Sequence, residues 1–269
     1  MKKIRSTIVN WAPSWLYYTI ANLRCRISGK AHRILAPRME LENIHLVTAG
    51  SESIYICRRG RHNRYKRGID TLINSLAKQY SLDRLNHLRG GTFIDCGANV
   101  GELGLWARNH NHTYFAFEPE QLESRCCDLN NFDGVNQTCR KPLWNKDGTL
   151  RLFHRAETAD TSLIENGNDT NYTDVEAVML DTALNKVQMQ GPIIFKVEAE
   201  GAEPEVLSGA SNLLKLIDYV ALDCGYERGK NSEHTFVETN KILSNAGFEL
   251  VSAHFKRVTA LYRRKSSAY

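Results

Sequence analysis

The sequence lacks paired cysteine motifs, internal repeats, low-complexity segments and long apolar runs. Its 7 cysteines form an odd set without C-x-x-C spacing, and no histidines follow them at ligand spacing. A disulfide framework and a bound metal are therefore both unexpected. The N-terminal region falls far short of the roughly 20 consecutive apolar residues that a membrane-spanning helix needs. It also lacks the small-residue cleavage site of a secretory signal, so we expect a cytoplasmic protein with no metal site.

The composition is that of a folded, mildly basic protein. The 269 residues carry 35 Lys and Arg against 30 Asp and Glu, for a net charge of +5, and 42% of them are hydrophobic. This length and hydrophobicity suffice for one large α/β domain with an N-terminal extension. The charge allows a nucleic-acid partner but does not imply one.

A run of basic residues interrupts the N-terminal half of the chain. Such a run usually forms a solvated face. With Tyr55 and Tyr65 interleaved, it also suggests the alternative of a nucleic-acid methyltransferase, although the Asn-Pro-Pro-Tyr type of motif that presents a flipped base is absent. The run consists of Arg58, Arg59, Arg61, Arg64, Lys66 and Arg67.

Residues 1–88 are interpreted as a helical, basic extension of a main domain over residues 89–269. Residues 1 to about 50 mix aromatic and aliphatic residues with lysine and arginine, as an amphipathic helix does, and 70–88 repeat apolar residues at helical spacing. The first of these helices either docks on the main domain or lies on a membrane surface or a partner. The second is expected to pack just before the first strand of the main domain.

From Thr92 onward the pattern alternates between strands and helices, which predicts a parallel sheet with both faces covered. The segments 248–252 and 258–262 are too close together for a crossover and must be antiparallel. We therefore predict an α/β, doubly wound, mostly parallel sheet with a reversed last strand. The other predicted strands are 92–95, 113–117, 135–139, 192–197 and 218–223, with a side hairpin of 149–153 and 175–180.

A glycine turn follows the first of these strands and predicts a small-molecule cradle. Asp95 ends the strand, Gly97 and Gly101 lie in the turn, and Glu118 stands at the end of the next strand. Glycine lets a ligand approach the main chain, and an acid after the second strand can hold the hydroxyls of a ribose. The spacing Asp-x-Gly-x-x-x-Gly differs from the G-x-G-x-x-G fingerprint of nicotinamide-binding folds.

Three charged residues at the end of the predicted strand 192–197 are candidates for catalysis. Side chains alternate along a strand, so Lys196, Glu198 and Glu200 are predicted to point the same way. Central parallel strands are normally apolar, and these charges should therefore face the crevice in which open α/β sheets bind ligands.

Together these motifs resemble those of the FkbM-type S-adenosylmethionine-dependent methyltransferases. The resemblance covers residues 92 to about 255 and lies in Ile94 to Gly101, in Glu118-Pro119, and in Lys196 to Glu203 followed by Val206 to Ala210. Glu198 stands where the family has aspartate, and Ala199 where it has valine. The resemblance implies a class I, Rossmann-like methyltransferase fold and S-adenosylmethionine as cofactor. The residues expected to bind it are Asp95, Gly97, Ala98, Asn99, Gly101, Glu118, Pro119, Leu143 and Trp144.

The resemblance further implies an O-methyltransferase that acts on a hydroxyl of a sugar in a glycan, a lipid-linked saccharide or a related metabolite. In this hypothesis Glu198 accepts or orients the hydroxyl proton, Lys196 keeps Glu198 ionised, and Glu200 and Glu203 shape the pocket. In the loop after the predicted strand 218–223, Asp223, Glu227, Arg228 and His234 could face the acceptor, and residues 158–162 could cover the site. Lys196 and Glu198 could instead form a buried ion pair with a structural role. A cofactor-binding module without catalysis is the non-enzymatic alternative. With a lipid-linked acceptor, the N-terminal helix would lie at the inner face of the membrane.

Overall fold

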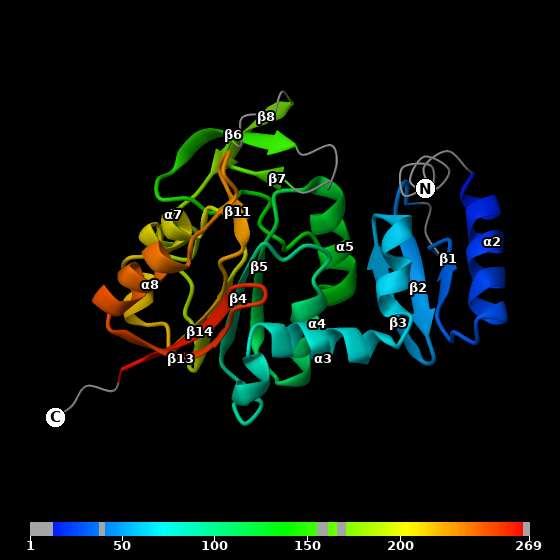
Figure 1. Ribbon diagram of the computed structural model, residues 1–269, viewed down its shortest axis with the longest axis horizontal. Helices are drawn as coiled ribbons and strands as arrows, with labels where there is room; N and C mark the ends of the chain where they lie inside the picture. Colours follow the sequence, from blue (N-terminus) through cyan, green and yellow to red (C-terminus); the bar gives the residue numbers. More distant parts are fainter. Residues whose placement is uncertain (1–12, 38–40, 155–160, 166–170, 266–269) are drawn as a thin grey trace.

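A six-stranded mixed sheet with helices on both faces forms the centre of the molecule (Figure 1). The computed structural model describes residues 13–37, 41–154, 161–165 and 171–265. The strand order is β13-β14-β10-β9-β4-β5. Neighbours among β5, β4, β9 and β10 are parallel, and β14 is antiparallel to both β10 and β13. These strands are β4 (Thr92–Cys96), β5 (Thr113–Phe117), β9 (Ile193–Val197), β10 (Tyr219–Asp223), β13 (Phe248–His254) and β14 (Thr259–Arg264).

Each face of this sheet has its own hydrophobic core, because successive residues of a strand point to opposite faces. Phe93 and Ile194 pack with the residues of α3 and α4 on one face. Their neighbours Ile94 and Phe195 pack with α6, α7 and α8 on the other. All five residues of β4 and of β9 are buried, as expected for central parallel strands. The helices of the two faces are α3 (Ile69–Gln79), α4 (Glu102–Asn109), α6 (Leu180–Ala183), α7 (Glu203–Ser208) and α8 (Phe236–Asn245).

The helix predicted over 70–88 is shorter than expected. The α3 helix ends at Gln79, and Ser81 has a left-handed backbone with φ of 57°. A separate 3-10 turn over Leu82–Leu85 follows it. The helical spacing of apolar residues in the sequence therefore continues beyond the end of the helix. The helix ends just before Tyr80, whose buried side chain contacts Glu198 at the carboxyl end of the sheet.

The prediction of a strand over 135–139 is wrong, except for one residue pair. Cys139 forms an isolated parallel bridge with Phe117. The backbone N–H groups of Gln137 and Thr138 donate instead to the carboxylate of Asp128, at 3.1 and 2.8 Å. Asp128 lies on α5 (Gln121–Asn131). A side chain thus satisfies the donors that a strand would have used for its ladder.

Two small sheets flank the carboxyl end of the central one. The predicted side hairpin exists as β6 (Gly148–His154) paired antiparallel with β8 (Tyr172–Ala177), and the short β7 (Thr161–Ser162) pairs with β6. A second hairpin, β11 (Tyr226–Arg228) with β12 (Glu233–His234), follows β10. Both hairpins contribute residues to the cavity described below.

The extension over 1–88 contains a sheet as well as helices, which corrects the prediction of a helical segment. A helix, α2 (Ser14–Ile27), precedes a three-stranded antiparallel sheet of β1 (Arg33–Leu35), β2 (His45–Ala49) and β3 (Glu52–Ile56). Burial alternates along β2, so its hydrophobic period is that of a strand. A 3-10 helix over Arg59–Tyr65 then leads to α3. Figure 1 shows the small sheet of the extension next to α3 and α5, beside the central sheet.

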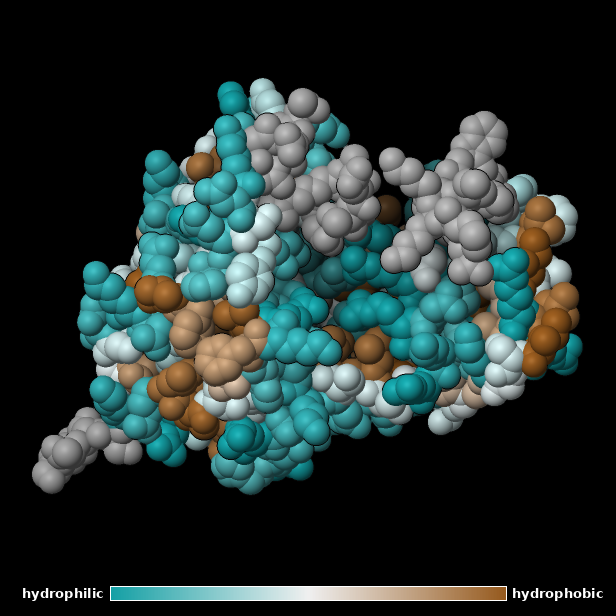
Figure 2. Space-filling model, viewed as in Figure 1, coloured by the Kyte–Doolittle hydropathy of each residue, from teal (hydrophilic) through white to brown (hydrophobic). Residues whose placement is uncertain are grey.

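The α2 helix is anchored to this small sheet through one side. The Asn22 side chain donates to the carbonyl of Ile34 and accepts from its N–H, both at 2.9 Å. Its opposite side exposes apolar residues, visible as the hydrophobic stripe at the edge of Figure 2. Among the described residues, no helix is long and apolar enough to cross a membrane. The predicted helix also included Lys2, Lys3, Arg5 and Trp11, which lie outside the described residues.

The turn after β4 passes very close to the end of β9. Gly97 has a φ of +73°, and a Cβ atom at this position would lie 2.1 Å from the backbone oxygen of Glu198. Glycine is therefore required at position 97 for two reasons: the backbone is left-handed, and there is no space for a side chain. This close approach joins the two strands that carry the candidate site.

We predict that Gly97→Ala destabilises the fold far more than Gly229→Ala. Gly229 has a similar φ of +66° but nothing within 4 Å of its Cβ position. Backbone strain should lower the free energy of unfolding of both variants by about 1–2 kcal/mol. In Gly97→Ala it should fall by about 1–3 kcal/mol more, because two backbone segments must move apart. Urea unfolding of both variants measures the difference, and equal losses would contradict the close approach.

Candidate functional site

A cavity of about 480 Å³ opens at the carboxyl ends of β4, β5 and β9. Its lining is strongly charged and, on balance, acidic. The acidic side chains are Asp95, Glu102, Glu118, Glu120, Glu123, Glu198, Glu200 and Glu227, and the basic ones are Arg58, Arg61, Arg64, Lys196 and Arg257. An excess of carboxylates in a concave site favours a cationic ligand.

The first part of the lining is the turn between β4 and α4 together with the end of β5. Asn99 has a left-handed backbone with φ of 51°, and its N–H donates to Oε2 of Glu118 at 2.8 Å. The other oxygen of Glu118 accepts from the N–H of Glu120 at 3.0 Å. Asp95, Gly97, Ala98, Asn99, Glu118 and Pro119, all predicted to bind the cofactor, line this part of the cavity.

Glu118 is a buried carboxylate that still has room to accept further hydrogen bonds. Its side chain is 7% exposed, and burial raises its pKa to about 7, although the N–H groups of Glu120 and Asn99 act to lower it. Each oxygen accepts one backbone hydrogen bond and can accept another. A carboxylate with two such oxygens in a cavity matches the vicinal hydroxyls of a ribose, so the residues present fit a nucleoside cofactor.

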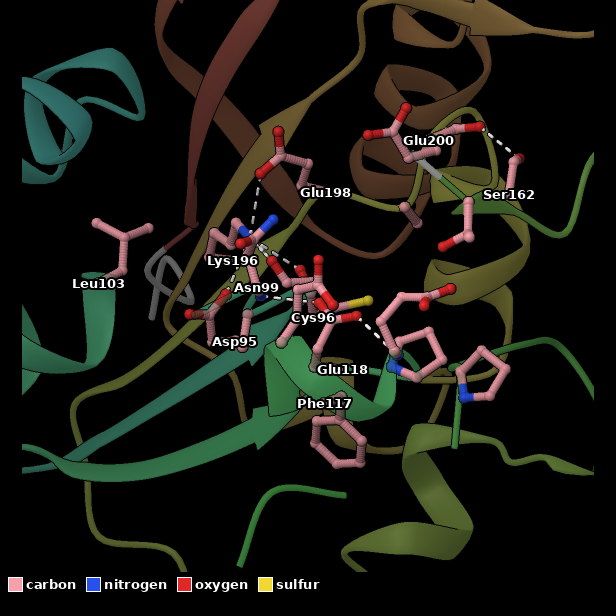
Figure 3. A pocket seen from close by; sticks show the side chains of 18 of the residues that line it. Asp95, Cys96, Asn99, Leu103, Phe117, Glu118, Ser162, Lys196, Glu198 and Glu200 are labelled. Atoms are coloured by element: carbon pink, nitrogen blue, oxygen red, sulfur yellow. Dashed lines mark hydrogen bonds and ion pairs between the residues drawn. The ribbon is translucent and has the colours of Figure 1, made fainter. Parts of the chain in front are cut away.

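Apolar side chains form a slot next to Glu118. Leu143, predicted to contact the cofactor, lines it, and its backbone forms an isolated bridge with Val178. Flat apolar walls suit the base of a nucleoside. Figure 3 shows Phe117 on this side of the cavity, below Glu118. The other apolar members of the slot are Pro119, Pro142, Leu152 and Leu163.

Two residues predicted to bind the cofactor lie outside the cavity lining. A Cβ at Gly101 would meet the side chains of Asn131 and Cys127 on α5, so Gly101 serves the packing of α5 on the turn. Trp144 is held by a backbone hydrogen bond to Val178, and its carbonyl faces Gly209. The Trp144 prediction rested on its place in the chain, and the turn at Leu143 directs the following residue away from the cavity.

Lys196 and Asp95 form a buried ion pair across the neighbouring strands β9 and β4. Lys196 Nζ lies 2.9 Å from Asp95 Oδ1, and both side chains are no more than 2% exposed. The ammonium also donates to the carbonyls of Cys96 and Gly97, at 3.0 and 2.8 Å. Burial alone would lower the pKa of Lys196, but the carboxylates of Asp95 and Glu198 raise it, so the ammonium stays charged.

Glu198 is held by three donors. Tyr80 donates to its Oε2 at 2.6 Å, Lys196 Nζ lies 3.4 Å from the same oxygen, and Arg257 Nη2 lies 3.0 Å from Oε1. Burial would raise the pKa of Glu198, but Lys196, Tyr80 and Arg257 together lower it. The predicted proximity of Lys196 and Glu198 is thus observed (Figure 3).

Glu200 does not point with Lys196 and Glu198 as strand alternation predicted. The strand ends at Val197, and Glu200 has a left-handed backbone with φ of 49°. Alternation therefore stops before this residue. Figure 3 shows Glu200 near Ser162, whose hydroxyl donates to the Glu200 carbonyl at 2.8 Å. Glu200 still lines the cavity, at its wall beside β7.

Three residues from other elements complete the site: Glu227, which sequence analysis placed facing the acceptor, and Tyr80 and Arg257, which it missed. Tyr80 follows α3, Arg257 lies in the turn between β13 and β14, and Glu227 lies on β11. Arg257 also forms an ion pair with Asp223 at 2.7 Å. The acid-rich segment after β10 signalled Glu227, but nothing in the sequence linked Tyr80 or Arg257 to Glu198.

The basic run is part of the cavity wall. Arg58 forms an ion pair with Glu123 at 2.7 Å, and Arg64 with Glu102 at 3.2 Å. Arg61 donates to Asn99 Oδ1 at 3.4 Å. The carboxylates of α4 and α5 thus neutralise two of these cations. Three residues of the run thus line the cavity, whereas Arg64, Lys66 and Arg67 have exposed side chains, so the expectation of a solvated face holds for only part of the run.

Comparison with known proteins identifies one family. The model of the methyltransferase FkbM domain family matches residues 95–250, which include the cradle and the charged end of β9. No curated protein matches the chain.

Solved structures of methyltransferases resemble the chain weakly. The methyltransferase FkbM from Methylobacillus flagellatus KT is 18% identical, with a TM-score of 0.43 over 65% of this chain. The match spans 43% of that longer protein. The magnesium protoporphyrin IX methyltransferase from Synechocystis PCC 6803, solved with bound SAM, is 12% identical, with a TM-score of 0.39 over 76% of this chain and 83% of its own. S-adenosylmethionine is the methyl donor of the FkbM family.

We predict that Glu118→Gln weakens binding of S-adenosylhomocysteine by about 10- to 100-fold, the range of a hydrogen bond to a charged group. Because the pKa of Glu118 is about 7, its negative charge is lost as pH falls through 7. Affinity of the unaltered protein should therefore fall between pH 8 and 6, while that of Glu118→Gln should not change.

Calorimetric titration at both pH values measures this. Glu176→Gln, an exposed carboxylate on β8, is the matched control and should bind normally. Normal binding by Glu118→Gln would remove Glu118 from the cofactor site.

Proposed function

Because the chain belongs to the FkbM methyltransferase family, we propose that it transfers a methyl group from S-adenosylmethionine to a hydroxyl oxygen of a sugar, in a glycan, a lipid-linked saccharide or a related metabolite. The observation that carries this proposal is that two carboxyl side chains, Glu198 and Glu227, line the same cavity as the cofactor cradle. The strand order, with β14 reversed beside β10, supports the class I methyltransferase fold that we propose for it.

Methylation of a hydroxyl requires that its proton leave. The cofactor supplies a methyl group bound to a positively charged sulfur. The protein must hold the hydroxyl oxygen close and aligned, and must accept its proton. A carboxyl group with a pKa near the working pH accepts a proton well and releases it again.

Glu227 meets this requirement best among the carboxyl groups at the end of β9 and β10. It lines the cavity and is half-buried. Burial is the main reason that its pKa rises to about 7, and the carboxylates of Asp223, Glu198 and Glu203 add to this, against the opposing effect of Arg257. Glu227 is therefore deprotonated in about half of the molecules near neutral pH.

Glu198 is better suited to orient the acceptor than to accept its proton. Its pKa is lowered, and Tyr80, Lys196 and Arg257 already contact its oxygens. A carboxylate held in this way is a weak base but a fixed hydrogen-bond acceptor. We propose that Glu198 positions the hydroxyl and that Glu227 accepts its proton.

The remaining cavity wall supports a hydroxyl-rich acceptor. Thr161, Ser162 and Glu200 line the side opposite the extension, and the arginines Arg58, Arg61 and Arg64 line the other. A polar wall with both donors and acceptors can hydrogen-bond the several hydroxyls of a sugar. Of the predicted cover over residues 158–162, Thr161 and Ser162 line the cavity, and residues 158–160 lie outside the described part of the chain.

We predict that Glu227→Gln lowers kcat by about 10²- to 10⁴-fold, the usual contribution of a positioned base, without weakening cofactor binding. Since Glu227 acts when deprotonated, kcat of the unaltered protein should rise as pH increases through about 7 and then level off. The assay follows labelled methyl groups from the cofactor into cell saccharide fractions, with RNA and DNA as comparison acceptors.

Glu233→Gln, an exposed carboxylate of the same hairpin, is the matched control and should retain activity. Transfer to nucleic acid alone would overturn the acceptor class. A pH dependence that persists in Glu227→Gln and disappears in Glu198→Gln would instead make Glu198 the proton acceptor.

We also propose that α2 rests on a membrane surface that carries lipid-linked acceptors. Its exposed side carries large apolar side chains, and Arg24 and Arg26 lie in its last turn. Such a helix binds the interface through its apolar face and through attraction of its cations to anionic lipids. The exposed apolar residues are Trp15 (69%), Ile20 (41%), Leu23 (56%) and Ile27 (79%).

We predict that Leu23→Glu reduces sedimentation of the protein with anionic phosphatidylglycerol vesicles by about tenfold, because it places a negative charge in the apolar face. Leu216→Glu, at another exposed leucine (60%), is the control and should sediment as the unaltered protein does. A membrane role for α2 would be rejected if all three proteins sedimented equally with the vesicles, or if none of them sedimented.

A further inference from the structure

Three potential metal ligands converge inside the N-terminal extension, away from the cavity. Cys25 comes from the last turn of α2, His32 from the segment before β1, and His62 from the 3-10 helix over Arg59–Tyr65. All three are buried, with exposures of 3%, 0% and 3%. One ligand atom of each lies within 4.8 Å of those of the other two.

Two of the three distances within this cluster match those between ligands that share one ion. His32 Nε2 lies 3.2 Å from His62 Nδ1 and 3.6 Å from Cys25 Sγ. Around a tetrahedral zinc ion, with bonds of about 2.0–2.1 Å to nitrogen and about 2.3 Å to sulfur, neighbouring ligands are about 3.3 Å (N to N) and 3.6 Å (N to S) apart.

Hydrogen bonds alone account poorly for the cluster. His32 Nε2 faces both Cys25 Sγ and His62 Nδ1, but a neutral imidazole nitrogen offers only one proton or one lone pair. His62 Nε2 lies 3.1 Å from Asn63 Nδ2, which leaves Nδ1 as the nitrogen of His62 that faces the cluster. The sulfur lies 4.0 Å from His32 Nδ1 and so sits beside the ring, and a cation bound by all three groups would require the Cys25 side chain or the His32 ring to turn.

We propose that Cys25, His32 and His62 form a binding site for one Zn²⁺ ion. One thiolate and two imidazoles are a typical ligand set for zinc, with a fourth position left for a small ligand. Zinc would displace the thiol proton to solvent on binding. The expectation of no metal came from spacing along the chain, which hides the cluster because 6 and 29 residues separate its members.

Such an ion would fix the extension to the wall of the cavity. It would join three elements of the extension: α2, the segment before β1 and the 3-10 helix. His62 lies beside Arg61, which contacts Asn99 in the cofactor cradle. Small substructures often depend on a structural metal for stability.

The test uses the full chain, expressed without a histidine tag in medium supplemented with zinc. We expect about one zinc ion per chain by mass spectrometry of the metal content, and a stoichiometric release of zinc when thiols are modified. Removal of zinc with EDTA should lower the Tm by about 5–10 °C, and added zinc should restore it. Cobalt substitution should produce the near-ultraviolet absorption of a cobalt–thiolate bond.

Variants identify the ligands. Cys25→Ser and His62→Asn should each lower zinc affinity at least about tenfold and abolish the effect of EDTA on Tm. His45→Gln, a buried histidine of the same extension outside the cluster, should keep the ion. Should a variant fail to fold, competition for zinc between the unaltered protein and a chromophoric chelator replaces it. The proposal is overturned by an unaltered protein that holds no stoichiometric zinc after reconstitution, or by equal zinc binding in all variants.

Discussion

The candidate site depends on the buried ion pair between Asp95 and Lys196. A buried charge without a partner is strongly destabilising, so these two side chains hold each other in place across β4 and β9. Lys196 also donates to the carbonyls of Cys96 and Gly97, at the start of the glycine cradle after β4. One ammonium group thus fixes the cradle on one side and faces Glu198 on the other.

The carboxyl groups of the cavity differ in pKa, and the ammonium of Lys196 is one cause of the difference. Glu198 lies close to Lys196 and Arg257 and has a lowered pKa. Arg257 lowers the pKa of Glu227 less than burial and the neighbouring carboxylates raise it, and burial is the main reason that the pKa values of Glu118 and Glu227 rise to about 7. Carboxyl groups whose pKa values are driven apart can take different roles, one fixed and ionised, another able to exchange a proton.

The N-terminal extension belongs to the site in two ways. Its 3-10 helix places Arg58, Arg61 and Arg64 in the cavity wall, where Glu102 and Glu123 bind two of them. Its core residues also join the face of the central sheet that α3 and α4 cover, since Val47 and Ile54 pack in the same cluster as Phe93 and Trp106. The extension is therefore a structural part of the cavity and not a separate appendage.

The sequence by itself determined the parallel sheet, the glycine cradle, Glu118 and the charged end of β9, because each depends on residues that are close in the chain. Period-two alternation, a glycine at positive φ and an acid after a strand are local signals. Two predictions from local signals were wrong. The carboxylate of Asp128 accepts the backbone hydrogen bonds of the predicted strand 135–139, and the left-handed backbone of Glu200 turns its side chain away from Lys196. Only the tertiary structure placed Tyr80 and Arg257 on Glu198, and Cys25 beside His32 and His62. Such contacts join residues far apart in the chain, so their energies come from burial and charge, which spacing along a sequence does not record.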